Sequence, residues 1–232
     1  MKNIKMDTFK LDNPAWYSLD EAHEEFAVNY DGLKFYQPAY CPFGGVFNDK
    51  SVALNIADYA SFTDYFFLIG DEPKIDQNVK IDGELVCNQM ILEKPIDLES
   101  NEYIVELQTY EQRVQLSTLV NLVQPGYFKE KTADLGTYYG IYKDKNLIAV
   151  AGERMKMNNY TELSAIVTHP DYTGKGYAKQ LISHVSNKIF NRSKIPYLHV
   201  ASDNANAIRL YQKLGFVSRR KLSFWKMSRV LR

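Results

Sequence analysis

Apolar residues recur along this chain with two different periods, and the change of period predicts where helices and strands lie. Two stretches repeat apolar positions every three or four residues, which is typical of a helix with one buried face. These positions are Leu116, Leu119, Val120 and Val123 in the first stretch, and Ala178, Leu181, Ile182, Val185 and Ile189 in the second. The first helix is expected to stop at Gln124-Pro125-Gly126, and the second to begin after Gly176.

Short apolar runs between turn residues predict the strands around these helices. A strand at Tyr103–Leu107 precedes the first helix. After it, the runs Tyr138–Tyr142, Leu147–Met157 and Glu162–Val167 are joined by polar turns, which predicts an antiparallel meander.

The carboxyl-terminal units follow the second helix. A strand at Tyr197–Ala201 leads into a helix at Asn204–Leu214, with Ser202 or Asp203 as its cap. Gly215 stands where a glycine ends a helix, and a strand pair is expected within Phe216–Met227. The order from residue 101 is then β α β β β α β α β β, a mixed, mostly antiparallel sheet with helices on both faces (class α/β, α+β).

The first hundred residues contain no catalytic motif. A helix is expected near Ser18–Tyr30, and strands at Asp64–Ile69 and Val79–Leu92. Glu93-Lys94-Pro95 indicates a boundary, because proline disfavours a continuing regular element. We therefore predict an α/β domain over residues 1–97, a candidate degenerate copy of the second, and a larger domain over residues 98–232.

Composition narrows the class of protein. The 232 residues are 45% hydrophobic and 24% charged, which is typical of a globular protein and excludes a disordered chain. No apolar run approaches the roughly 20 residues that cross a bilayer. The first residues have no apolar core of a signal peptide, which favours a cytoplasmic location. Cys41 and Cys87 make neither a disulfide framework nor a metal spacing, and no metal is implied.

Charge is distributed unevenly. Residues 1–100 hold 8 Lys and Arg against 18 Asp and Glu, a net charge of −10, and residues 101–232 hold 20 against 10, a net of +10. A basic half suits an anionic ligand and an acidic half a cationic one, although the halves could equally complement each other across an interface. The basic cluster Arg219, Arg220 and Lys221 lacks interleaved aromatics, so nucleic-acid binding is not expected.

Gly174-Lys175-Gly176 is the strongest local signal for a ligand. Glycines at the start of a helix expose backbone N–H groups where the helix dipole favours an oxyanion, which suits a diphosphate. The pattern lacks the GK[ST] of a Walker A loop, and Lys179 occupies the third glycine position of a dinucleotide motif. ATP and NAD are therefore not expected.

The run His169–Ala178 resembles the acyl-CoA motif of the GCN5-related N-acetyltransferases (GNAT), R/Q-x-x-G-x-G/A. Asn204–Phe216 resembles the later motif of the same family, and Ala151–Met155 with the following strands resembles its FR47-like branch. The resemblance covers about residues 101–232. One position departs from it, because Thr173 stands where the family has Arg or Gln, so Lys175, Lys179 or another basic residue has to supply the charge.

The resemblance implies a set of residues that bind acetyl-CoA as co-substrate. They are Ile166, Val167 and Thr168 along the pantetheine arm, Thr173, Gly174, Lys175, Gly176, Tyr177 and Ala178 at the pyrophosphate, and Asn204 and Ala207 beside the arm. A main-chain N–H near Val167 would face the oxyanion of the attacked thioester. The residues alone leave alternatives: core packing for Ile166 and Val167, and a helix cap for Asn204.

Amine acylation implies an acid and a base. An alkylamine with a pKa of about 10.4 must lose a proton, and Glu162, then Glu153, are the candidate bases; each could instead be a strand carboxylate paired with Arg154 or Lys156. Tyr211, through its family position, is the candidate acid for the departing CoA thiolate, and a buried helix aromatic is its alternative.

The sequence thus predicts an acyl-CoA-dependent N-acetyltransferase that transfers acetyl directly to a primary amine of a small molecule. A cationic acceptor, such as a polyamine, is a hypothesis that rests only on the acidity of the first half. Two alternatives stay open: acetylation of a protein lysine or amino terminus, and a non-catalytic acyl-CoA sensor.

Overall fold

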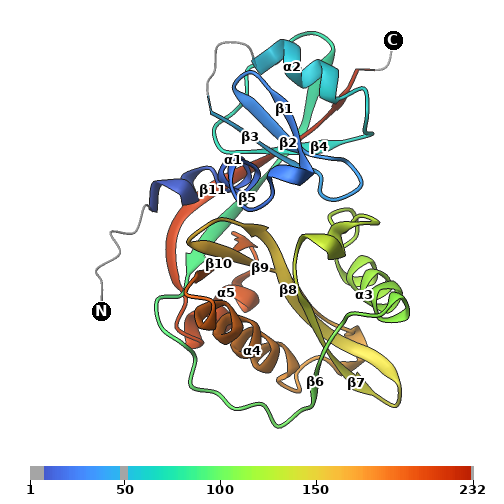
Figure 1. The fold of residues 1–232 in the computed structure, drawn as a ribbon, viewed down its shortest axis with the longest axis vertical. Helices are drawn as coiled ribbons and strands as arrows, with labels where there is room; N and C mark the ends of the chain where they lie inside the picture. Colours follow the sequence, from blue (N-terminus) through green and yellow to red (C-terminus); the bar gives the residue numbers. More distant parts are fainter. Residues whose placement is uncertain (1–7, 48–51, 231–232) are drawn as a thin grey trace.

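The computed structural model describes residues 8–47 and 52–230, and no side chain is described for residues 52–55. Among these residues, one mixed sheet of eleven strands runs through both halves of the chain (Figure 1). The strands are β1 (Ala27–Tyr30), β2 (Leu33–Tyr36), β3 (Phe43–Val46), β4 (Phe66–Ile69), β5 (Val79–Ile91), β6 (Ile104–Glu106), β7 (Tyr138–Lys143), β8 (Asn146–Lys156), β9 (Tyr160–Thr168), β10 (Ile195–Ala201) and β11 (Val217–Arg229). Their order across the sheet is β1-β2-β3-β4-β11-β5-β10-β9-β8-β7-β6.

Helices cover both faces of this sheet, as the sequence predicts. They are α1 (Pro14–Asp20), α2 (Val52–Tyr59), α3 (Tyr110–Val123), α4 (Tyr177–Asn191) and α5 (Ala205–Lys213), with short 3-10 turns η1 (Thr8–Asp12), η2 (Glu24–Phe26), η3 (Thr132–Leu135) and η4 (Pro170–Tyr172). Along β8, Ala149 and Ala151 pack into the cluster under α4, whereas Val150 packs into the cluster under α3. This alternation places α3 and α4 on opposite faces.

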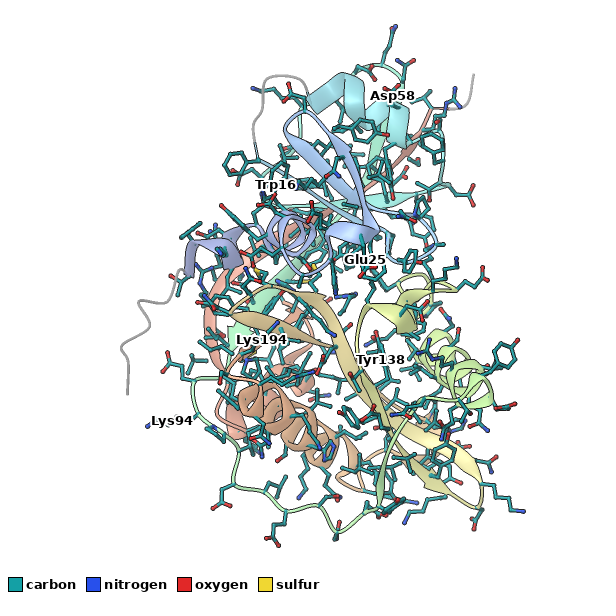
Figure 2. The ribbon with its side chains drawn as sticks, viewed as in Figure 1. Trp16, Glu25, Asp58, Lys94, Tyr138 and Lys194 are labelled. Atoms are coloured by element: carbon teal, nitrogen blue, oxygen red, sulfur yellow. The ribbon has the colours of Figure 1, made fainter. Side chains whose placement is uncertain are left out.

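The sheet corrects the expected ending of the chain. The region predicted as a strand pair within Phe216–Met227 is one long strand, β11, with a shift of register between Ser218 and Arg220. Its partner comes from the first half: β5 pairs antiparallel with β11 from Val217↔Ile91 to Arg229↔Val79, and with β10 along its other edge. The division at residues 97 and 98 stays a prediction, since the sheet is continuous across it. The segment that follows β5, with Lys94 exposed, runs outside α4 (Figure 2).

Two smaller expectations are corrected. The helix expected near Ser18–Tyr30 is the short α1, because it begins earlier, at Pro14, and the chain turns through η2 into strand β1. The cap of α5 is Asn204 rather than Ser202 or Asp203. Gly215 (φ +94°) ends α5 as expected, and the N–H of Phe216 donates to the carbonyl of Tyr211. Part of the segment judged not to be a signal peptide lies in residues 1–7, outside the described ones. No described helix is long and apolar enough to cross a membrane.

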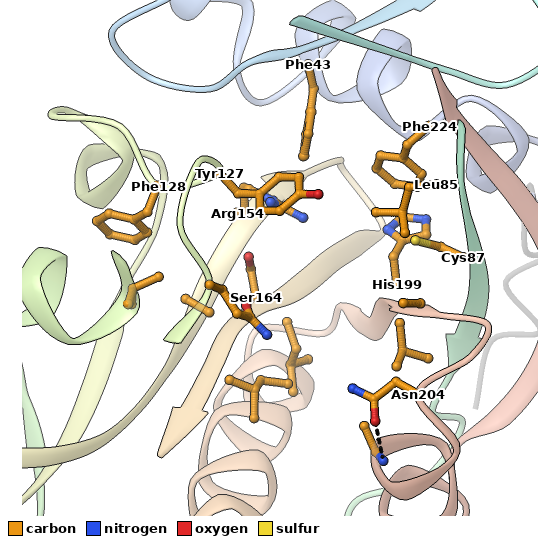
Figure 3. A pocket seen from close by; sticks show the side chains of 18 of the residues that line it. Phe43, Leu85, Cys87, Tyr127, Phe128, Arg154, Ser164, His199, Asn204 and Phe224 are labelled. Atoms are coloured by element: carbon orange, nitrogen blue, oxygen red, sulfur yellow. Dashed lines mark hydrogen bonds between the residues drawn. The ribbon is translucent and has the colours of Figure 1, made fainter. Parts of the chain in front are cut away.

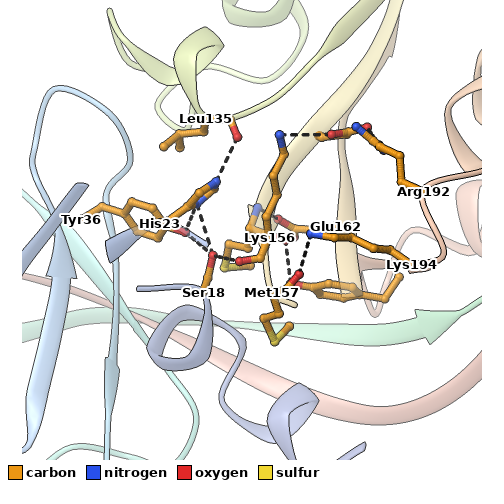
Figure 4. Close-up of polar contacts among 12 residues, drawn as sticks. Ser18, His23, Tyr36, Leu135, Lys156, Met157, Glu162, Arg192 and Lys194 are labelled. Carbon is orange, nitrogen blue, oxygen red and sulfur yellow. Dashed lines mark hydrogen bonds and ion pairs between the residues drawn. The ribbon is translucent and has the colours of Figure 1, made fainter. Parts of the chain in front are cut away.

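A buried polar network fastens the first half onto the second (Figure 4). His23 Nε2 donates to the carbonyl of Leu135 at 3.0 Å, so its Nδ1 is the acceptor for the Tyr36 hydroxyl at 2.8 Å. Ser18 Oγ lies 2.7 Å from that hydroxyl and donates to the carbonyl of Lys156 at 2.9 Å. The arrangement needs a neutral imidazole, and burial, with the nearby Lys156 charge, lowers the pKa of His23 to about 3.

We expect this histidine to make the fold less stable in mild acid. In the unfolded chain His23 takes up a proton as the pH falls below a pKa of about 6.5, whereas in the folded chain it does so only near pH 3. The contribution of neutral His23 to the stability of the fold is therefore complete above pH 6.5 and is lost as the pH falls. The free energy of unfolding should drop by about 1 to 2 kcal/mol more in the wild type than in His23→Gln between pH 6.5 and 5. Urea unfolding at several pH values measures this, with His169→Gln, at a half-buried position outside the network, as the control. Equal slopes for wild type and His23→Gln would contradict it.

Candidate functional site

The turn before α4 has the backbone geometry expected of an anion cradle. Gly174 and Gly176 adopt left-handed conformations (φ +76° and +81°), and Gly176 is the N-cap of α4 with no side-chain capping bond. A Cβ at Gly174 would meet no atom within 4 Å, so the backbone conformation, not crowding, requires glycine there, and the space beyond is open. The first N–H groups of α4 thus keep their capacity to bind an anion.

The side chains of the cradle are arranged as follows. Thr173 Oγ1 donates to the carbonyl of Pro170 at 3.1 Å, so its hydroxyl proton is already used. Lys175 Nζ lies 5.0 Å from the ring centre of Tyr172, outside the helix end. Tyr177 and Ala178 face the core cluster beneath α4. Lys175 in this turn and Lys179, whose Cε lies 3.0 Å from where a Cβ at Gly176 would stand, are the charged groups near the helix end that can replace the Arg or Gln missing at Thr173.

Strand β9 separates from β10 and bulges against β8 within a few residues. It pairs with β10 only from Tyr160 to Glu162, after which the two strands separate. On its other edge, Ser164 pairs with Gly152 and Val167 with Val150, so β9 carries one extra residue between them. Ala165 takes a positive φ of 50° at this bulge. Strands β9 and β10 are therefore separated here, and the bulge turns the backbone of Ala165 and Ile166 toward the gap between them.

A cavity of about 380 Å³ fills the gap between β9 and β10 (Figure 3). Residues from five parts of the chain line it: Phe43; Leu85 and Cys87; Val120, Gln124, Pro125, Tyr127, Phe128 and Thr132; Arg154, Leu163, Ser164, Ala165 and Ile166; and His199, Val200, Ala201, Asn204, Ala207, Tyr211 and Phe224. Its volume lies in the usual range for small-molecule sites.

Four of the residues singled out from the sequence meet in this cavity: Ile166, Asn204, Ala207 and Tyr211. Asn204 also caps α5, since its Oδ1 accepts from the Ala207 N–H at 3.1 Å, so the capping alternative holds alongside its place in the cavity. Val167 and Thr168 lie outside the lining. The side chain of Val167 packs into the cluster under α3, as its core-packing alternative predicts.

Tyr211 lies at the α5 side of the cavity. Its ring is edge-on to Phe216, with the ring centres 5.9 Å apart, and it is almost fully buried. Burial raises the pKa of its hydroxyl to about 12, so the group is protonated at neutral pH. A protonated hydroxyl at the cavity wall has the state that a general acid requires.

Arg154, Glu162 and His199 form a buried polar group at the floor of the site. Arg154 Nε and Nη2 each donate to one oxygen of Glu162 at 2.9 Å, and His199 Nδ1 donates to Oε1 at 2.9 Å. His199 Nε2 accepts from Gln89 Nε2 at 3.1 Å. Burial opposes the charge of Glu162, but Arg154 and His199 overcome it and lower its pKa to about 2. The arrangement is a bidentate Arg154–Glu162 ion pair with the His199 imidazole hydrogen-bonded behind it.

This geometry argues against both candidate bases. Glu162 is fully buried and its two oxygens already accept three side-chain hydrogen bonds, so at neutral pH it has almost no tendency to take a proton. Glu153 lies outside the cavity lining, where Arg192 and Lys156 pair with it. Pairing with Arg154 and Lys156 was the alternative for these carboxylates, but both are buried rather than at the surface.

Other lining residues were not predicted to belong to the site. Arg154 lines the cavity with its guanidinium 4.5 Å from the ring centre of Phe43. His199 could have been paired with Glu162 by alternation, since both lie on the same face of adjacent strands. Phe43 and Leu85 come from the first half, and no periodicity predicts that a distant strand faces this cavity. Among the described residues, no group of three His, Cys, Asp or Glu gathers at a metal-binding distance.

Comparisons with known proteins agree with this geometry. Residues 138–225 match the family model of FR47-like proteins. A GNAT-family protein from Novosphingobium aromaticivorans superposes with a TM-score of 0.85 at 32% identity, over 95% of this chain and 99% of that one. A GCN5-related N-acetyltransferase from Kribbella flavida has the same fold, with a TM-score of 0.59, 14% identity and 89% and 90% coverage.

A curated relative matches a shorter part. Spermidine N(1)-acetyltransferase of Vibrio cholerae is 43% identical over 79 residues, which are 32% of this chain. The chain spans 44% of the length of that relative, so the match leaves most of both chains uncompared.

Proposed function

Because this chain belongs to the GCN5-related N-acetyltransferase (GNAT) family, we propose that it transfers an acetyl group from acetyl-CoA directly to a primary amine of a small molecule. The observation that carries the proposal is the bulge of β9 at the cavity. Ala165 and Ile166 line the cavity, and the chain then runs from β9 through η4 into the glycine turn of α4. One segment thus contributes both backbone at the reacting centre and the anion cradle.

The residues of this chain fit acetyl-CoA at both ends. The N–H groups at the start of α4, with Lys175, would hold the pyrophosphate, and the bulged backbone near Ala165–Val167 would direct an N–H at the thioester oxygen. Asn204 and Ala207 would flank the arm between them. The co-substrate supplies an activated acyl group, so no covalent enzyme intermediate is required.

Tyr211 is the residue that we assign as general acid. Its protonated hydroxyl would donate to the CoA thiolate, whose thiol has a pKa of about 8.5, as it leaves. Tyr211 lines the cavity. This supports catalysis over a non-catalytic acyl-CoA sensor, in which Tyr211 would point away from the thioester.

We assign no side chain as the base. Glu162 instead positions Arg154 and His199 along the cavity floor, and the ammonium proton leaves to water. An acceptor amine with a pKa close to neutral then reacts faster than a lysine-like amine, because more of it is unprotonated.

The cavity favours a small acceptor over a peptide. Phe43, Leu85 and Cys87 line the side that faces the first half, and these mainly apolar side chains suit a small acceptor better than a peptide backbone, whose polar groups need hydrogen bonds. These three residues are uncharged, so the first half contributes no carboxylate to the cavity lining. The cavity lining therefore does not support the cationic acceptor that the acidity of the first half suggested.

The proposal is tested by calorimetric titration with acetyl-CoA, followed by an amine screen that detects thiol release. We expect acetyl-CoA and CoA to bind, ATP not to bind, and at least one primary amine to release CoA. Tyr211→Phe should lower kcat about 10- to 100-fold with little change in acetyl-CoA affinity, since the ring stays and only the proton donor is lost. If neither acetyl-CoA nor CoA binds at millimolar concentration, weaker than about −4 kcal/mol, the proposal fails. Binding without any thiol release would favour the sensor.

A further inference from the structure

A second cavity lies next to the cavity at the β9 bulge. This second cavity, of about 400 Å³, shares Leu85, Pro125 and Tyr127 with the first. Its other lining residues are Tyr65, Phe67, Gly83, Glu84, Gly126 and Lys226. We call these two neighbouring cavities the passage; its lining extends from Ala165, beside the proposed reacting centre, to residues of β4 and β11.

The walls of this passage are mainly apolar and aromatic. Phe43, Phe67 and Phe224 lie on three adjacent strands. The Phe43 ring contacts the other two edge-on, with ring centres 5.8 Å from Phe67 and 5.5 Å from Phe224. Tyr127 covers Phe67 from the loop after α3, at 5.4 Å. The body of a molecule that occupies the passage should therefore be apolar.

Two lysine ammonium groups stand at the outer end, over one ring. Lys129 Nζ lies 4.2 Å from the ring centre of Tyr65 and donates to its hydroxyl at 2.8 Å, and Lys226 Nζ lies 5.1 Å from the same centre. The Tyr65 hydroxyl in turn donates to the carbonyl of Gly126, which fixes the loop that forms the wall.

The acids near these lysines have other partners. Glu84 borders the second cavity, but its carboxylate accepts from Ser223. Asp82, whose charge Lys226 influences, pairs with Lys80 at 3.2 Å. Within the described residues, neither Lys129 nor Lys226 lies at ion-pair distance from a carboxylate, so the two ammonium groups bring two positive charges to Tyr65 against the one negative charge of Glu84 in the cavity lining.

We infer that the acceptor amine carries a carboxylate at the far end of an apolar body, and that Lys129 and Lys226 bind this carboxylate while the amine lies at the β9 bulge. The inference rests on the proposed function and names its substrate class. Two ammonium groups attract an anion and repel a second ammonium, so the passage discriminates against diamines and polyamines.

The test uses three primary amines on one benzyl body, which differ only at the para position: carboxylate, carboxamide and aminomethyl. Binding to the CoA complex is measured by calorimetry, and transfer from acetyl-CoA by thiol release. We expect the carboxylate to bind at least about 10-fold more tightly than the carboxamide and the diamine most weakly. The double variant K129Q/K226Q should bring the carboxylate within about 3-fold of the carboxamide and leave carboxamide and acetyl-CoA binding unchanged.

The control K94Q/K145Q removes the same charge from exposed positions outside both cavities and should keep the carboxylate preference. A preference for the diamine, equal binding of all three amines or no binding at all overturns the inference, as does a carboxylate preference that survives in K129Q/K226Q. If the carboxylate binds in a lysine-dependent way but no amine is acetylated, the anion site stands and the proposed function fails.

Discussion

Arg154→Met should lower the free energy of unfolding by about 3 to 5 kcal/mol, because the variant leaves the Glu162 carboxylate buried with no guanidinium beside it. Methionine fills a similar space, so the lost ion pair and not a cavity dominates the effect. In a chain of 232 residues this corresponds to a fall in Tm of about 6 to 20 °C. Chemical denaturation followed by tryptophan fluorescence measures it.

Two variants separate the buried charge from other causes. Arg192→Met also removes a partner of a buried carboxylate, but Glu153 keeps Lys156 at 3.3 Å and Arg192 is partly exposed, so we expect a loss below about 2 kcal/mol. The double variant R154M/E162Q removes both charges of the pair and should recover at least half of the loss. A loss below 1 kcal/mol in Arg154→Met alone would mean that the pair does not stabilise the fold, and our account of the site floor would be wrong.

Replacing both cradle glycines, as in G174A/G176A, should weaken acetyl-CoA binding about 10- to 100-fold. Alanine disfavours the left-handed conformations at φ +76° and +81°; its Cβ enters open space at position 174 and meets the Lys179 side chain at 3.0 Å at position 176. The loss of one or two charge-assisted hydrogen bonds to the pyrophosphate accounts for the magnitude. Calorimetric titration with acetyl-CoA measures the change in affinity.

Gly70→Ala is the matched control for backbone strain. Gly70 also has a positive φ (+132°) and no atom within 4 Å of an added Cβ, but it lies at the end of β4, away from α4. It should lower stability without changing acetyl-CoA affinity. An affinity of G174A/G176A within about 3-fold of the wild type would show that the glycine turn does not bind the co-substrate.

Features that depend on neighbouring residues could be predicted from the sequence. The apolar repeats of α3 and α4, the glycine stop at Gly215 and the left-handed glycines before α4 each express preferences of a few consecutive residues. The same short segments carry the family resemblance, which is why Ile166, Asn204, Ala207 and Tyr211 were found before the cavity was known.

The roles of the charged residues could not be predicted in the same way. The sequence offers Arg154 as one possible partner of Glu162, but it does not show that Arg154 and His199 both lie 2.9 Å from this carboxylate at a buried position. Because the pKa of a carboxylate depends on burial and on such neighbours, an acid that looks like a base in the sequence is held ionised and fully bonded in the fold. The bulge at Ala165 could not be predicted either, because no glycine marks its positive φ.

The sequence by itself determined the family, the meander of β7, β8 and β9 and the glycine turn before α4, because local spacing and turn chemistry specify them. Only the tertiary structure decided what closes the cavity. Strand β5 lies between β10 and β11 although more than a hundred residues separate it from either. This strand brings Leu85 and Cys87 to the acceptor side, and strand β3, further along the sheet, brings Phe43. Such pairing depends on which distant strand packs best at the open edge of a sheet. The apolar periodicity of neither strand shows which partner it will pair with.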